Sequence, residues 1–316
     1  LALVARVLPA TSKWQWNINA NISYNKNQIM QLPDGNKTVV EDNRYLMVGQ
    51  PINSFRLSQY NGIYLNEDMI PFDPYTGLKY KNESGQYVQV GWADYEDVDK
   101  DNQYVSWKDK KPIGDPNPKW VGGLNTNLSY GPWSLFVQTS FTLGRDILNT
   151  QFAKTMAPLS AQYGADEEGV GFSGGPGANY ANPADGHWYY AEDFVARRMM
   201  VDLSRYSFWQ KDGDNTNYPS RSQYMNNNNF IERSSLFLEN GSYLKLNTIM
   251  LSYNLDKLKK WGINNARLSL TAENVAIIKS KNTLAADPSN VSPDGYYTGN
   301  GYGLPRKFTI GLMFDF

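Results

Sequence analysis

Long segments of the chain alternate strictly between apolar and polar residues, and this alternation limits the fold more than any other feature. Period-two alternation places successive side chains on opposite faces of a β-strand. The clearest segment, 14–25, is about twice as long as a usual strand of a soluble protein, roughly 5–6 residues. Its apolar face consists of Trp14, Trp16, Ile18, Ala20, Ile22 and Tyr24, and its polar face of Gln15, Asn17, Asn19, Asn21, Ser23 and Asn25.

The segments 120–130, 133–143, 266–273 and 308–316 repeat this pattern. None of the apolar-face positions is charged, although charged residues make up 19% of the chain. A lysine or arginine facing lipid at mid-bilayer costs roughly 2–4 kcal/mol, which explains the exclusion. A soluble β-sandwich also alternates, but its polar face normally carries more Lys and Glu than the Asn, Ser, Thr and Gln found here. The pattern therefore favours an all-β, transmembrane antiparallel barrel.

Composition excludes several other classes. No apolar run approaches the roughly 20 residues of a membrane-spanning helix. The absence of cysteine excludes disulfides and thiol chemistry, and a net charge of −1 offers no basic field for nucleic acid. The chain starts without Met or a recognisable signal peptide, and 1–11 is too short to span a membrane. We therefore expect either a piece of a longer protein or a processed product.

The connections between the expected strands differ in length in a regular way. Barrels of this class have short periplasmic turns and long extracellular loops. We count about eight strands, including the weaker segments 41–48 and 55–65, and loops too large for so narrow a rim. Segment 243–253 departs from alternation, so it contains either a bulge or a lipid-facing Lys245 near the rim. The expected loops are 27–40, 66–119, 146–242 and 279–305, and the expected turns are 49–51, 131–132 and 256–265.

Several stretches resemble the SusC/RagA family of TonB-linked outer-membrane proteins. In order and spacing they match the C-terminal third of that family. The stretches are VGQPINSF (48–55), YNGIY (60–64), DYEDVDKDNQ (94–103), the long segment 113–149, YLKLNTIMLSYNL (243–255), RLSLTAENV (267–275) and LPRKFTIGLMFDF (304–316).

The resemblance implies a barrel of about 22 strands with an N-terminal plug and a TonB box. Neither is found in the sequence, so 1–316 is expected to be the C-terminal barrel segment. It also implies the bacterial outer membrane and active import of oligosaccharide or peptide, without enzymatic activity or a required cofactor. The implied partners are a SusD-like surface lipoprotein, the TonB complex, the barrel-assembly machinery and outer-membrane lipid.

Two other functions remain open at this stage. One is an adhesive or structural outer-membrane barrel without TonB coupling, which a plug and TonB box upstream would exclude. The other is a soluble β-rich carbohydrate-binding or carbohydrate-active protein, because acidic residues are plentiful and a glycosidase needs only two carboxylates at the right separation. Solubility without detergent would favour the latter.

Three places are candidate sites. Asp97, Asp99 and Asp101 have the spacing of the first half of a calcium loop, with Lys108 where an acid is expected and Asp109 one residue later. The alternative there is a solvated acidic turn without Ca²⁺. His187, Trp188, Tyr189 and Tyr190 lie together on the longest expected loop, where they either bind ligand or pack locally. Phe316 ends the last strand and resembles the signal by which barrels are recognised for insertion.

Overall fold

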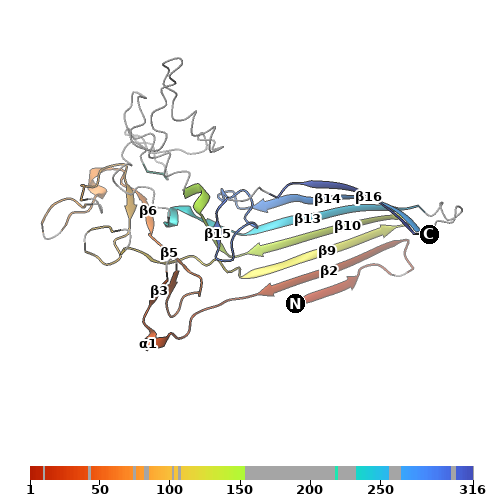
Figure 1. Cartoon of the computed structure of the whole chain (residues 1–316), viewed down its shortest axis with the longest axis horizontal. Coiled ribbons are helices and arrows are strands. Elements are labelled where there is room, and N and C mark those ends of the chain that lie inside the picture. Colours follow the sequence, from red (N-terminus) through yellow and green to blue (C-terminus); the bar gives the residue numbers. More distant parts are fainter. Residues whose placement is uncertain are drawn as a thin grey trace, which may run out of the picture.

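A seven-stranded antiparallel sheet forms the body of the molecule (Figure 1). The computed structural model describes residues 1–9, 11–41, 44–73, 76–81, 85–101, 103–105, 108–153, 218–219, 233–255, 265–299 and 304–315. The sheet order is β1-β2-β9-β10-β13-β14-β16, so the all-β antiparallel prediction is confirmed. Its strands are β1 (Ala2–Arg6), β2 (Trp14–Tyr24), β9 (Trp120–Tyr130), β10 (Trp133–Leu143), β13 (Tyr243–Asn254), β14 (Asn265–Lys279) and β16 (Lys307–Asp315).

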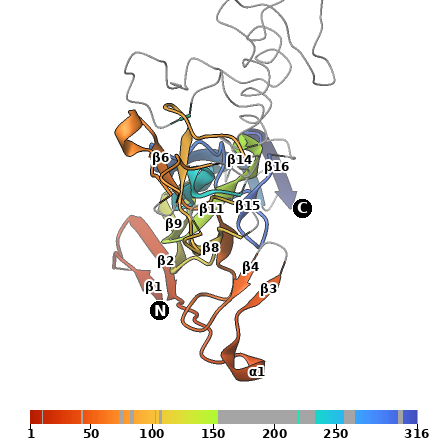
Figure 2. The same ribbon diagram turned by 90° about the vertical axis from the view of Figure 1, so that its left-hand side faces the viewer.

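All the shorter elements lie toward one end of this sheet (Figures 1 and 2). They form a four-stranded, a three-stranded and a two-stranded sheet. Among the described residues, no helix has the length and apolar character needed to cross a membrane. The elements are α1 (Pro33–Asn36), β3 (Val39–Glu41), β4 (Arg44–Leu46), β5 (Phe55–Leu57), β6 (Tyr60–Ile63), η1 (Glu67–Met69), β7 (Ala93–Tyr95), β8 (Lys111–Ile113), β11 (Asp146–Asn149), η3 (Ser235–Phe237), β12 (Leu238–Asn240) and β15 (Tyr296–Tyr297).

The expectation that 41–48 and 55–65 cross the membrane is wrong. β2 pairs with β9 along its whole length, from Trp14↔Tyr130 to Tyr24↔Trp120. Everything between these two strands therefore belongs to one connection at one end of the sheet, and 49–51 is not a periplasmic turn. The strands in that connection have only 3–4 residues, whereas a membrane-spanning strand needs roughly 9–11. A short strand that the sequence did not reveal, β1, pairs with β2 instead.

Long and short connections separate cleanly between the two ends of the sheet. The connections 25–119, 144–242 and 280–306 leave and rejoin the sheet at the end that carries the small sheets (Figure 1). The connections 7–13, 131–132 and 255–264 leave and rejoin it at the opposite end. Apart from the turn at 49–51, this separation is as predicted, and the loop-length rule assigns the long connections to the extracellular side.

The apolar face of the sheet is open to the surroundings rather than packed in an interior. The register aligns apolar positions across neighbouring strands, as in Trp16↔Leu128 and Leu251↔Leu270. Ile310 is 75% exposed and Phe308 78% exposed, which no soluble core residue would be. An apolar face of this kind is the surface that a barrel presents to lipid. Its exposed members include Trp14, Trp16, Ile22, Tyr24, Trp120, Leu124, Tyr130, Trp133, Leu251, Leu268, Leu270, Phe308, Ile310, Leu312 and Phe314.

Aromatic pairs border this face at both ends. Trp14 packs in a tilted arrangement against Tyr130 with ring centroids 4.5 Å apart at the short-turn end, and Tyr24 packs likewise against Trp120 at 4.6 Å at the loop end. Trp120 and Tyr130 begin and end β9, so they lie roughly 33 Å apart along the strand. A strand tilt of about 40° reduces this to a height of about 25 Å, the height of the apolar band of outer-membrane barrels.

A β-bulge at Asn247 explains the irregular alternation in β13. Gln138 pairs with Thr248 and Thr139 with Leu246, which leaves Asn247 as an extra residue. The extra residue keeps Leu246 on the lipid-facing side and turns Lys245 to the inner side, where it is 8% exposed. Of the two explanations open from the sequence, the bulge is correct and the lipid-facing lysine is wrong.

The buried core lies almost entirely in the loop region. The clusters of buried apolar side chains come from 55–105, 147–153, 237 and 285–297. The long strands contribute only Ala266 to the buried apolar residues of the described part. The sheet is thus a single-layer wall, and the described loop residues at one end of it form a packed structure of their own.

Candidate functional site

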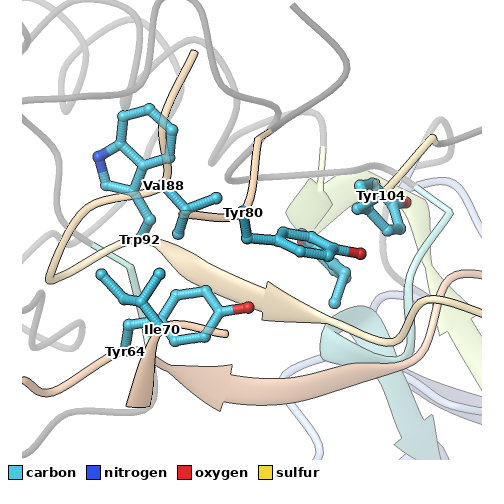
Figure 3. Close-up of a cluster of buried hydrophobic side chains, with 7 residues drawn as sticks. Tyr64, Ile70, Tyr80, Val88, Trp92 and Tyr104 are labelled. Carbon is cyan, nitrogen blue, oxygen red and sulfur yellow. The ribbon is translucent and has the colours of Figure 1, made fainter. Parts of the chain in front are cut away.

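The first long connection folds around an aromatic core of its own (Figure 3). This core brings together side chains from β7 and from the segments before and after that strand, with Tyr95 and Tyr104 stacked at 5.2 Å. Because it has a packed core, this connection forms an ordered structure of its own. The core consists of Tyr64, Ile70, Tyr80, Val88, Trp92, Tyr95 and Tyr104.

An acidic side chain lies at the edge of this core. The Tyr64 hydroxyl donates a hydrogen bond of 2.9 Å to Oδ1 of Asp94. Burial raises the pKa of Asp94, and the hydrogen bond from Tyr64 opposes that rise. Tyr64 directly follows β6 and Asp94 lies in β7, so this hydrogen bond supports the pairing of the two strands.

The predicted calcium loop folds into a compact acidic cluster. Carboxylate oxygens of Asp97, Asp99 and Asp109 all lie within 4.8 Å of one another. Asp109 is fully buried and accepts hydrogen bonds from the backbone N–H groups of Val98 at 2.9 Å and Val105 at 2.6 Å. Asp109 thus closes the loop on itself from its far end.

The cluster contains Asp109 in place of the predicted Asp101. Asp101 forms an ion pair of 3.3 Å with Lys108 and accepts the backbone N–H of Gln103, and it is not a member of the cluster. Asp109 takes the third place. The sequence signal was the acid one residue beyond the expected twelfth position, after a loop one residue longer than the usual calcium loop.

The other predicted site residues lie outside the described residues. His187, Trp188, Tyr189 and Tyr190 belong to 154–217, and Phe316 follows the last described residue. Their assignment to ligand binding and to membrane insertion stays a prediction.

A network that the sequence did not reveal holds the loop 280–299 against the inner wall. Nζ of Lys245 contacts Oδ2 of Asp287 at 3.1 Å and Oγ of Ser289 at 2.9 Å. The Arg145 guanidinium, which follows β10, donates to the carbonyls of Gly241 and Pro288. Burial lowers the pKa of Arg145, so this cation is held in a partly desolvated place.

Glu239 fixes the same loop from the three-stranded sheet. Its carboxylate accepts Nδ2 of Asn149 at 2.8 Å and the backbone N–H of Ala285 at 2.9 Å. Burial raises the pKa of Glu239, while these hydrogen bonds oppose the rise. The residues of this network are up to 143 positions apart, so no local motif could have identified them.

The inner face of the wall is polar but mostly uncharged. Asn127 accepts a hydrogen bond of 3.0 Å from Ser134, and Asn247 donates one of 2.9 Å to Ser140. Amide and hydroxyl groups can donate and accept hydrogen bonds without demanding a charged partner. Such a wall suits passage of polar, neutral groups.

Comparison with known proteins agrees with this architecture. No family model matches the chain. It is 25% identical over 97% of its length to TonB-dependent receptor P26 of Formosa agariphila, and 25% identical over 95% to TonB-dependent receptor P3 of the same organism. The chain spans only 28% and 27% of the length of these relatives.

Solved structures give the same fold. The RagAB peptide importer in its open-open state matches with a TM-score of 0.62 at 20% identity, over 100% of this chain and 28% of that chain. The closed-closed state matches with a TM-score of 0.62 at 18% identity, over 99% of this chain and 28% of that chain. The chain is therefore similar over nearly its whole length to TonB-dependent receptors, which are outer-membrane proteins, and its fold is that of the C-terminal part of a SusC/RagA-like barrel.

Proposed function

We propose that residues 1–316 form the C-terminal barrel wall and extracellular loops of a TonB-dependent importer of oligosaccharides or peptides, which acts with a SusD-like surface lipoprotein. The observation that carries the proposal is the two-faced wall, with lipid-facing Leu124 and Leu251 outside and neutral polar side chains inside. Hydrogen-bonding groups without charge suit peptide backbones and sugar hydroxyls alike. Likeness to a peptide importer favours the peptide.

Uptake by whole cells tests the proposal. Cells that express the receptor containing this chain should accumulate labelled peptides or oligosaccharides, and the same cells without TonB should not. The receptor extracted in detergent should bring a surface lipoprotein with it. Uptake that is independent of TonB would contradict energy coupling, and a receptor that purifies without any lipoprotein would contradict the partner.

The choice between ligand classes uses the same cells. The cells are given a labelled mixture of neutral oligopeptides or a labelled mixture of neutral oligosaccharides. We expect one of the two mixtures to accumulate in the cells and the other not to. Accumulation of neither class would overturn the proposal that this chain lines a nutrient path.

A further inference from the structure

Amide side chains gather on the inner face of three neighbouring strands, β2, β9 and β10 (Figure 1). The register places Asn19 directly opposite Asn125, which in turn lies opposite Gln138 on the next strand. The Cβ atoms of residues directly opposite one another lie about 4.5–5.5 Å apart, so these side chains form one continuous surface. This surface, the amide patch, consists of Asn17, Asn19, Asn21, Asn125, Asn127 and Gln138.

Most of the hydrogen-bonding groups of the amide patch are uncommitted. Within the described part of the chain, the side chains of Asn19, Asn125 and Gln138 form no hydrogen bond. Asn19 is exposed, and the other two are half-buried. Each side-chain amide offers two donors and two acceptors. The amide patch is therefore a surface of free hydrogen-bonding groups that faces the barrel interior.

The amides of β2 repeat at the period of an extended peptide. Asn17, Asn19 and Asn21 occupy alternate positions of one strand, so successive amides lie about 6.6 Å apart at a rise of about 3.3 Å per residue. An extended peptide alongside the strand presents a backbone N–H and C=O toward the same side at the same interval. One side-chain amide can accept from that N–H and donate to that C=O.

The surroundings of the amide patch favour a peptide over a sugar. β2, β9 and β10 contain no charged residue, and Phe136 is the one aromatic side chain on their inner faces. A peptide backbone consists of neutral amides, which side-chain amides match in donors and acceptors. Aromatic rings that could cover the apolar face of a sugar ring are scarce on this surface.

We propose that the amide patch binds the backbone of a transported peptide, which lies extended along β2. This inference rests on the import function proposed above, and it adds the ligand class and the residues that recognise it. Backbone groups are common to all peptides, so recognition through them tolerates different side chains. Such a surface suits an importer that takes up peptides of mixed sequence.

Uptake of backbone-methylated peptides by cells that express the whole receptor tests this contact. An N-methylated peptide lacks N–H donors, so it would make only the C=O half of the contact. Each lost hydrogen bond weakens binding by about twofold to tenfold. Asn19→Val combined with Asn125→Val should therefore raise the apparent KM of the parent peptide by about tenfold, but that of the N-methylated peptide by only about threefold.

Thr271→Val combined with Thr309→Val is the matched control. These threonines also lie opposite each other on the inner face of the wall, and the same two residues replace them. The control should change both apparent KM values by no more than about twofold. Both double variants should give native amounts of heat-modifiable barrel. If the valine pair at 19 and 125 does not assemble, Asn19→Ser with Asn125→Ser provides the same comparison.

Several outcomes would overturn the inference. Equal rises in apparent KM for the two peptides, or no rise for either, would show that the amides do not recognise the backbone. Uptake without TonB in the asparagine double variant would show that the amide patch holds a plug instead of a peptide. Accumulation of oligosaccharides alone by the native receptor would overturn this inference and leave the import proposal standing, whereas accumulation of neither class would overturn both.

Discussion

Lys245 of β13 and Asp287 of the loop 280–299 form an ion pair, with Nζ 3.1 Å from Oδ2 and both side chains largely buried. The pair exists because the bulge at Asn247 turns Lys245 away from lipid and toward the inner wall. One irregularity in a strand thus determines where the loop 280–299 is held against the wall.

Removing one partner of this pair should release the loop. Lys245→Met leaves Asp287 partly buried without its cation, which costs roughly 3–5 kcal/mol of local stability. Hydrogen exchange of 280–299 should therefore rise strongly in Lys245→Met. Lys307→Met is the matched control, because its ion pair with Glu273 is exposed and should leave that loop unchanged. Unchanged exchange in Lys245→Met would contradict the assigned role.

The same pair predicts a dependence on pH. Burial alone raises the pKa of Asp287, but hydrogen bonds from Ser289 and Lys245 outweigh it, and the net pKa is lowered. A lowered pKa means that the pair stabilises the loop at neutral pH and loses this contribution only as pH falls below about 3.9 toward the folded-state value. A double-mutant cycle of Lys245→Met with Asp287→Asn should give a coupling energy at pH 7 that persists at pH 5. Loss of the coupling already between pH 7 and 5 would contradict this assignment.

Deleting Asn247 should disrupt the upper part of β13. Without the extra residue, Leu244 and Leu246 would turn inward and Lys245 would face lipid near the rim. We expect little folded, heat-modifiable barrel on gel electrophoresis. Asn247→Ser keeps the residue count, so it should assemble normally. Normal assembly of the deletion variant would show that the bulge does not set the register.

Gly122 should not tolerate a side chain. A Cβ there would lie 2.3 Å from the Asn21 carbonyl oxygen and 2.7 Å from Cζ of Phe141. Gly122→Ala should therefore destabilise the barrel by about 1–3 kcal/mol, measured as a lower urea midpoint. Ser129→Ala in the same strand should stay within about 0.5 kcal/mol. Equal midpoints for the two variants would mean that Phe141 does not cover the glycine in the membrane.

The sequence predicted the wall well because the wall obeys local rules. Alternation in 14–25 and 120–130 requires only that one face of the strand contacts lipid and the other contacts water. The polarity of each residue therefore indicates which of the two it contacts. Segment 243–253 broke the pattern, and the structure shows a bulge there. Exclusion of charge from the lipid face could thus be inferred without any tertiary contact.

The loops were harder because their structure depends on distant partners. The strands in 41–48 and 55–65 pack in a loop subdomain, and short apolar runs do not tell a loop strand from a membrane strand. Asp109 joins Asp97 through a turn whose length differs by one residue from the known motif. Contacts such as Arg145 with Pro288 join segments that no periodicity relates.

Lipid contact at alternate residues of β9 tests the central claim most directly. The chain has no cysteine of its own, so Leu124→Cys and Asn125→Cys can each carry a fluorophore in the barrel reconstituted in vesicles. Brominated lipid should quench the label at 124 strongly and leave the label at 125, which faces the aqueous interior, nearly unaffected. Equal quenching at the two positions, or none at 124, would show that hydrocarbon does not cover the apolar face.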